Sequence, residues 1–390
     1  MTDEATADAA TKEEGADEER HATNLELFLD LVFVFAVTQI TGELSHHLSW
    51  SGVGRAALLA WLVWWQWSQF TWAGSAVDLQ RRAATRLLVL VTIPTTLVMT
   101  TALPGAFAEA GPWFGVAYLI VQLLVLAMQG SEAIKSDAMR KAFVSYASLA
   151  AISPIVVLVG GFLDGDARIA AWIAASAINI AGALRGSGKG EWAINPVHFA
   201  ERHALFVIIA LGEVLVAVGA TATTQGLTPS VLLGLGLAAG GACVLWWTYF
   251  AFIPEVAERV LRKASRSQRG ILARDLFTFG HFPIVAGVIC YAVVVKHVIP
   301  VPWYVLGLGD RLMLLAAAVL IVGGYLHIQV RVVRRLAPER IAALAVVSGW
   351  TTLAATVPGA IVLGVVVVIL AAMQAITWRR FQMSVAASRR

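Results

Sequence analysis

The stretch NLELFLDLVFVFAVTQI, residues 24–40, places two carboxylates near the start of a segment that is otherwise mostly apolar. Glu26 and Asp30 are four residues apart, so on a helix they share one face. An ionisable residue inside an apolar span is costly in lipid and is by default a candidate for function. This run therefore raises the question of what the rest of the chain supplies to hold two acids there.

The whole chain has the composition of a membrane protein. Of its 390 residues 58% are hydrophobic and 14% charged, and the mean hydropathy is +0.75. A soluble domain is about half apolar and about a quarter charged, so soluble enzymes are disfavoured. The net charge of +4 is explained by basic loops facing anionic lipid, and no nucleic-acid partner is predicted.

The apolar runs predict an all-α polytopic membrane protein of about twelve transmembrane helices. A bilayer-crossing helix needs about 20 apolar residues. With a cytoplasmic N-terminus, all but four of the 29 basic residues fall in inner loops or beside them, the pattern of a multi-pass protein with both termini inside. The four exceptions are Arg55, Arg168, Lys296 and Arg311. The candidate spans are 25–47, 54–75, 86–107, 112–131, 141–163, 167–184, 199–222, 229–253, 275–296, 308–330, 340–357 and 359–378.

The second half of the chain echoes the first. LVFVFAVTQ (31–39) aligns with LFVIIALGE (205–213), and LVWWQWSQF (62–70) aligns with VLWWTYFAF (244–252). We expect two parallel six-helix repeats, because an even number of spans inserts both copies in the same direction. Pairs of this kind commonly place a pathway at the junction between the halves. The predicted organisation is a disordered acidic tail at 1–24, repeats at 25–190 and 191–380, and a basic C-terminal tail at 381–390.

The seventh span opens with HFAERHALFVIIALGE, residues 198–213, which is unusually rich in ionisable groups. His198, Arg202 and Glu213 project within about 60° of one another on a helix with 3.6 residues per turn. Glu201 and His203 lie beside them. Charge pairs from Glu201 and Arg202 to the acids of the first span would explain why lipid tolerates those acids. A structural clamp and a gated ion pair both fit this pattern.

Glu213 is the first candidate for a proton- or cation-handling group. It lies twelve residues beyond Glu201, about 18 Å along the helix axis. That places it near the middle of a hydrocarbon core about 30 Å thick, where a carboxylate must be protonated, paired or facing water. Its counterpart in the first repeat is Gln39. For Glu26, at the helix boundary, a simple interaction with the helix dipole is an equally good interpretation.

A metal site is not favoured. The segment HFAERH contains neither H-E-x-x-H nor H-x-x-E-H. Cys243 and Cys290 lie singly in apolar runs and predict neither a disulfide framework nor a thiolate site. No cofactor is predicted.

The two motifs, ELFLDLVFVFAVTQI (26–40) and HFAERHALFVIIALGE, are similar to the signatures of the low temperature requirement protein A family. The resemblance covers roughly residues 22–380 and implies a polytopic protein of the bacterial inner membrane. The signature positions of that family map onto Glu26, Asp30, His198, Glu201, Arg202, His203 and Glu213.

The first span also resembles a second family. LELFLDLVFVFAVT (25–38) is similar to the first-helix signature of the endolysosomal potassium and proton channels, L-E-x-F-S-D-x-V-F-x-x-A-x-T. That resemblance implies six-helix repeats with this helix lining a pore. The chain departs from the signature at two places: Asn24 or Thr23 replaces the usual preceding arginine, and Leu29 replaces a serine. Ala204 stands where the second repeat would carry the counterpart of Asp30.

These observations favour a transporter or channel that moves protons, cations or a small solute between the two repeats. One alternative is an intramembrane enzyme acting on a lipid or isoprenoid, with Glu213 and His198 as acid and base. Another is a structural or sensory membrane protein without turnover. The expected partner is the lipid bilayer, and assembly into a homo-oligomer is left open.

Overall fold

The computed structural model describes residues 20–77, 79 and 83–388, and every regular element within them is a helix. An isolated bridge joins Val305 and Pro358. The helices of the first half are α2 (Asn24–His46), α3 (Trp50–Ala76), α4 (Ala83–Thr101), α5 (Gly111–Ala133), α6 (Asp137–Ala150), α7 (Ser153–Gly161) and α8 (Gly165–Ser187). Those of the second half are α9 (Pro196–Gln225), α10 (Pro229–Phe250), α11 (Ile253–Lys263), α12 (Arg266–Leu272), the π-helix η1 (Ala273–Phe279), α13 (Gly280–Val298), α14 (Leu308–Val333), α15 (Pro338–Leu353) and α16 (Gly359–Ser388).

Among the described residues, ten helices are long and apolar enough to cross a bilayer, counting helices that follow one another directly as one span. This confirms the all-α polytopic fold. The other two predicted spans correspond to α3 and α15. Helix α3 has 27 residues, but its tryptophan and glutamine side chains lower its hydropathy. Most of them are buried in the protein, namely Trp64, Trp65, Gln66, Trp67, Gln69 and Trp72. Helix α15 has 16 residues, about 24 Å, which is shorter than a hydrocarbon core of about 30 Å.

Prolines interrupt two of the spans. The span predicted at 141–163 is divided into α6 and α7. Pro154 lies in the first turn of α7, where the missing N–H of proline is tolerated. In the ninth span Pro283 has no N–H to donate to the carbonyl of Phe279, four residues earlier. The chain before it widens into the π-helix η1.

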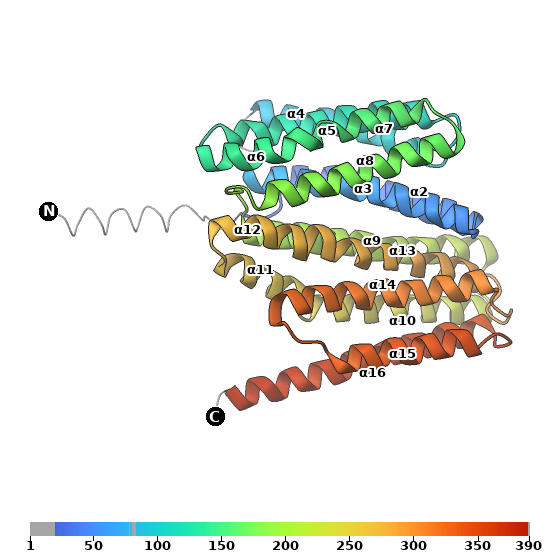
Figure 1. Ribbon diagram of the computed structural model, residues 1–390. Helices are drawn as coiled ribbons and strands as arrows, with labels where there is room; N and C mark the ends of the chain where they lie inside the picture. Colours follow the sequence, from blue (N-terminus) through green and yellow to red (C-terminus); the bar gives the residue numbers. More distant parts are fainter. Residues whose placement is uncertain (1–19, 78, 80–82, 389–390) are drawn as a thin grey trace.

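The helices run along one common direction and form two groups (Figure 1). In the first group α2 packs against α3 and α4, α4 against α5, and α8 against α6 and α7. In the second group α9 packs against α10 and α13, α13 against α14, and α16 against α15. Helices α2 and α3 meet α9 and α13 where the groups join. This shared packing order is what a duplicated six-helix unit would produce, and the repeat itself stays a prediction.

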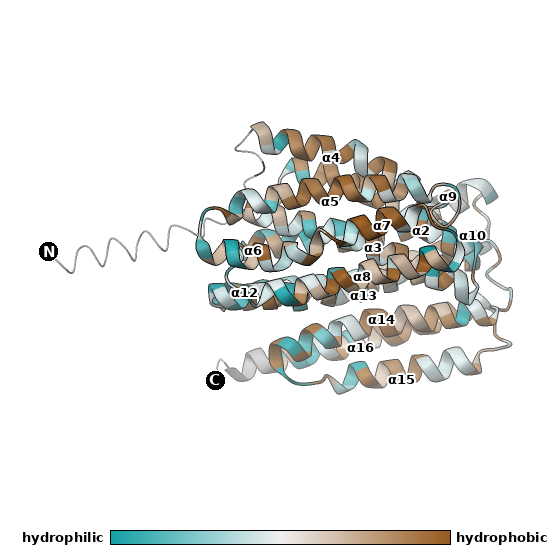
Figure 2. Ribbon diagram, turned by 45° about the horizontal axis from the view of Figure 1, so that its top comes forward, coloured by the Kyte–Doolittle hydropathy of each residue, from teal (hydrophilic) through white to brown (hydrophobic). Residues whose placement is uncertain are grey.

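Hydrophilic residues gather at the two ends of the bundle, and long hydrophobic stretches of α4, α5 and α7 lie between them (Figure 2). The described start of the chain and the end of α16 lie at the same end of the bundle (Figure 1). Which membrane face this end occupies stays a prediction. Most of the predicted N-terminal tail lies outside the described residues, and α16 continues through residues 381–388 of the predicted C-terminal tail.

Helices α13 and α14 approach closely through glycines, as membrane helices commonly do. A Cβ added at Gly324 would lie 2.6 Å from Cγ1 of Ile284 and 3.0 Å from the carbonyl oxygen of Gly280. At the neighbouring Gly323 an added Cβ would meet no atom within 4 Å. Only the first of these two glycines is required by packing.

We therefore expect Gly324→Val to lower the free energy of unfolding by about 1–3 kcal/mol, the usual range for overpacking. Gly323→Val makes the same change in helix propensity one residue away and is the matched control. Thermal unfolding of both purified variants in detergent measures the difference. Equal unfolding temperatures for the two variants would contradict the close contact.

Candidate functional site

The first polar layer, which we define as Glu26, Asp30, His198, Arg202 and Trp67, joins α2 to α9 and α3. Arg202 donates hydrogen bonds to both carboxylate oxygens of Asp30, with Nη2 2.8 Å from Oδ1. Trp67 Nε1 donates to the same Oδ1 atom at 2.9 Å. The pair expected between the first and seventh spans is therefore present, with Arg202 as the base.

Glu26 uses its two oxygens for different purposes. Oε2 accepts from the backbone N–H of Thr23 at 2.9 Å, while the Thr23 hydroxyl accepts from the Glu26 N–H, so the two residues form a capping box. Oε1 accepts from Nε2 of His198 at 2.8 Å and lies 3.7 Å from Nε of Arg202. Glu26 therefore serves its own helix terminus and also pairs with the other half of the chain.

Local sequence fixes this register. Asn195 caps α9 by accepting from the His198 N–H at 3.2 Å, and Pro196 follows as the first helical residue. His198 and Arg202 are then spaced four residues apart, as are Glu26 and Asp30. Equal spacing on two packed helices places one acid–base contact on each turn.

The first layer is fully enclosed by protein. Exposure is 2% for Glu26, 1% for Asp30, 2% for His198 and 0% for Arg202. Two carboxylates share this enclosed space with one guanidinium and the imidazole of His198. Because removing one member of a buried pair leaves an uncompensated charge, each base is a strong constraint on the fold.

The second polar layer, which we define as Thr38, Glu213 and Lys296, holds the acid predicted to matter most. Lys296 Nζ lies 3.2 Å from Oε1 of Glu213, and the Thr38 hydroxyl donates to Oε2 at 2.5 Å. The Glu213 side chain is 3% exposed. The requirement that this carboxylate be protonated, paired or facing water is met by pairing.

Lys296 was missed as a site residue, although it was one of the four basic residues outside the inner loops. It lies at the end of a predicted span, two residues before the last residue of α13. A lysine that violates the general charge asymmetry in a membrane helix is a signal for a specific partner. The residue of α2 that bonds Glu213 is Thr38, the direct neighbour of the predicted counterpart Gln39.

Three predicted site residues lie outside both layers: Gln39, Glu201 and His203. Glu201 accepts from the Ala22 N–H at 2.8 Å and lies 3.2 Å from Nδ1 of His21, so it holds the segment before α2 rather than the acids of α2. His203 is fully buried, and its Nδ1 donates to the carbonyl of Phe199 at 2.8 Å. Its ring packs among aromatic side chains, including Trp67 at 5.0 Å between centroids.

Apolar side chains separate the two layers. Phe33 and Val37 on α2, with Phe206 and Ala210 on α9, are at most 3% exposed. We define these four residues as the apolar plug. Asp30 and Thr38 are eight residues apart, about 12 Å along α2. The junction between the halves therefore has a polar contact on each side of a hydrocarbon section.

The largest space at the junction lies elsewhere. A cavity of about 470 Å³ is bounded by α2 and α3 from the first half and α13 and α14 from the second. Its walls are almost entirely apolar, for example Ile40, Ala60, Ile289 and Leu312, with Ser49 at the end of the helices. Glu213 is not one of its lining residues.

No group of three or more His, Cys, Asp or Glu side chains that could hold a metal ion occurs among the described residues. The ionisable groups of the two layers are instead matched acid to base. Their chemistry suits proton or cation exchange by opening and closing of ion pairs.

The spans and the buried ion pairs between them define a multi-pass integral membrane protein with charged contacts at the junction of two helix groups. The chain belongs to the bacterial low temperature requirement A protein family, whose sequence model matches residues 21–375. It is similar to an uncharacterized protein of Rhizobium meliloti (strain 1021), with 33% identity over 289 residues, which cover 69% of this chain and 67% of the relative. No solved structure matches the chain.

Proposed function

We propose that this protein transports protons, a cation or a small polar solute along the interface between α2 and α9. The observation that carries the proposal is that two ion-pair layers cross the junction of the halves at different depths, the first one buried and the second one with Glu213 buried and Lys296 22% exposed. Each layer joins α2 to a helix of the other half and closes one side of the apolar plug. The similarity of residues 25–38 to the first-helix signature of the endolysosomal channels also supports a pathway along α2.

Opening of the proposed pathway to one side of the membrane requires that the ion pair of one layer separate while that of the other layer stays intact. Protonation of Glu213, or its contact with a cation, weakens its attraction to Lys296 and frees α9 from α13 on that side. Separation of Asp30 from Arg202 opens the other side. A solute that pairs differently with the two layers can shift the population between these states, because a ligand moves an equilibrium only through differential affinity.

Flux measurements in proteoliposomes test this proposal. We expect the purified protein to move protons, Na⁺ or K⁺ down an imposed gradient, and Glu213→Gln to reduce that flux at least about tenfold. Glu43→Gln is the matched control, since Glu43 lies on α2 but its side chain is 38% exposed and pairs with His47. Wild-type protein that folds in the vesicles and passes none of these ions would overturn the ion-transport proposal.

A second candidate is supported by the apolar cavity at the junction. A space of about 470 Å³ is within the range of small-molecule sites, and hydrocarbon walls exclude water. A fatty acyl or isoprenyl chain of a membrane lipid is the occupant that these walls suit. In this case the protein binds or moves a lipid, and the ion pairs only hold the halves together.

Ala316→Phe, which fills the cavity, separates the two candidates. Loss of co-purified lipid in mass spectrometry, with ion flux unchanged, would favour lipid binding. Val319→Phe places the same side chain on a 46% exposed position of α14 and is the control. Unchanged lipid content in Ala316→Phe would remove the second candidate.

A further inference from the structure

The interior of the first half contains uncharged polar side chains that neither ion-pair layer uses. We call them the polar column: Gln66 and Gln69 on α3, Tyr118 and Gln122 on α5, Tyr146 on α6 and Asn179 on α8. Each is at most 4% exposed. Polar residues facing the interior of a membrane bundle are costly and are commonly associated with water or a solute.

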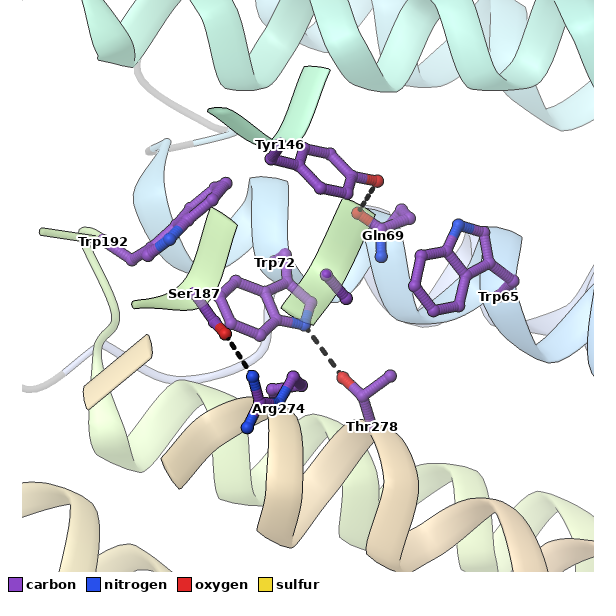
Figure 3. Close-up of a pocket in the computed structure, with 9 residues that line it drawn as sticks. Trp65, Gln69, Trp72, Tyr146, Ser187, Trp192, Arg274 and Thr278 are labelled. Carbon is purple, nitrogen blue, oxygen red and sulfur yellow. Dashed lines mark hydrogen bonds between the residues drawn. The ribbon is translucent and has the colours of Figure 1, made fainter. Parts of the chain in front are cut away.

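Some members of the column bond one another. The Tyr146 hydroxyl donates to Oε1 of Gln69 at 2.6 Å, as Figure 3 shows. Nδ2 of Asn179 donates to the Tyr118 hydroxyl at 3.2 Å. These contacts connect α3 with α6 and α5 with α8, so the column crosses the centre of the first half.

The hydrogen bonding of the column is incomplete. Gln122 and Trp65 lie close to the Tyr146 hydroxyl, but their contacts with it fall short of good hydrogen-bond geometry. Five buried amide atoms in this region also lack a protein partner: Oε1 of Gln66, Nε2 and Oε1 of Gln122, Oε1 of Gln129 and Oδ1 of Asn179. Buried polar atoms without a protein partner are normally satisfied by internal water.

There is room for water at two places along the column, one beside Gln69 and Tyr146 and one beside Gln129. A cavity of about 20 Å³ is lined by Gln69, Tyr146, Arg274 and Thr278, and these side chains surround it in Figure 3. A second cavity of about 20 Å³ is lined by Gln129 and Glu132. A water molecule needs roughly 10–15 Å³ of such space and two to four polar partners, and the first cavity offers both.

The column is directed toward one end of the bundle. Along α5, Tyr118 and Gln129 are eleven residues apart, about 16 Å, and Glu132 follows near the end of the helix. Beyond Tyr118 the rings of Phe114 and Trp172 lie 5.1 Å apart, and Trp172 Nε1 donates to the carbonyl of Val157. An aromatic cap therefore closes the column at the end away from Glu132.

We propose that the first half binds a chain of ordered water molecules, which enters beside Glu132 and ends beneath Trp172. The chain brings water and exchangeable protons to the middle of the membrane. Two buried tyrosines of the second half lie outside the column and line neither small cavity: the Tyr249 hydroxyl contacts Nε2 of His281 at 2.8 Å, and that of Tyr291 donates to the Ala238 carbonyl at 3.3 Å. This water site is separate from the α2–α9 interface and does not depend on transport there.

Hydroxyl-radical labelling by X-ray radiolysis of the full chain in lipid nanodiscs tests the proposal, because radicals formed from bound water oxidise adjacent rings. We expect Tyr118, Tyr146 and Trp65 to be oxidised at least about fivefold faster than Tyr249 and Tyr291. All four tyrosines are buried, at no more than 4% exposed, so bulk solvent cannot produce the difference. Equal rates for the two sets would overturn the proposal without any variant.

A substitution then locates the water. Gln122→Leu removes both unpartnered atoms of that amide, and we expect it to reduce the oxidation of Tyr146 at least about threefold. Gln374→Leu is the matched control, since Gln374 is a buried amide on α16 with an unpartnered Nε2 atom. Unchanged labelling of Tyr146 in a folded Gln122→Leu protein would place the water elsewhere and overturn the column.

Discussion

Replacing Arg202 with methionine is expected to lower the free energy of unfolding by about 3–5 kcal/mol, the range for removing one partner of a buried ion pair. Arg202 donates to Asp30 and lies beside Glu26, and all three side chains are enclosed by protein. Without the guanidinium, two carboxylates remain next to each other with only His198 to offset them. Thermal or denaturant unfolding of the purified protein in detergent measures the loss.

A double substitution distinguishes charge from packing. In Arg202→Met/Asp30→Leu both charges are absent, and apolar replacement of a whole buried pair is often neutral. We expect this protein to recover most of the lost stability. Arg259→Met is the surface control, because Arg259 pairs with Glu255 while both side chains are more than half exposed, and little change is expected. A single Arg202→Met variant as stable as the control would show that the first layer does not hold the halves together.

Breaking either layer is expected to expose the apolar plug from one side only. A cysteine at position 210, in a chain with Cys243→Ser and Cys290→Ala, reports on this plug, which is closed in the structure. Asp30→Asn weakens the first layer, and we expect at least tenfold faster modification by an impermeant thiol reagent added at the end where α2 begins. A layer that contributes 1.4 kcal/mol or more changes the open population about tenfold.

Glu213→Gln weakens the second layer instead. We expect it to increase modification of the cysteine at position 210 by thiol reagent added at the end of the bundle opposite to the start of α2. A cysteine at position 347 is the control for unfolding, because Val347 is fully buried in α15 and should stay unreactive in every variant. Modification of position 210 from both sides at once would indicate general loosening. Modification from neither side, with both variants folded, would mean that the layers do not gate this interface.

Together the two experiments separate a clamp from a gate. A clamp requires only the stability loss in Arg202→Met. A gate requires in addition that position 210 respond from opposite sides to the two layers. A gate requires a closed section between two contacts that can open separately. The structure contains this arrangement, since the apolar plug lies between the two layers and is shielded from solvent at both ends.

The class of protein could be predicted from the sequence because membrane insertion depends on local properties. Continuous apolar runs and the distribution of basic residues identify the helices, whereas the break near Pro154 and the π-helix before Pro283 appear only in the structure. Part of the first polar layer was also predictable, since Arg202 was expected to pair with the acids of the first span. The second contact comes from His198 rather than from the predicted Glu201. Helix periodicity turns a four-residue spacing into a shared face.

Tertiary structure alone decided which faces meet. Lys296 lies 83 residues after Glu213, and no periodicity within either helix connects the two. The same holds for the polar column, whose amides come from α3, α5 and α8 and appear in the sequence only as scattered glutamines and one asparagine. A sequence pattern describes one helix at a time, whereas a buried polar group is satisfied by atoms on other helices, and their positions depend on how all the helices pack.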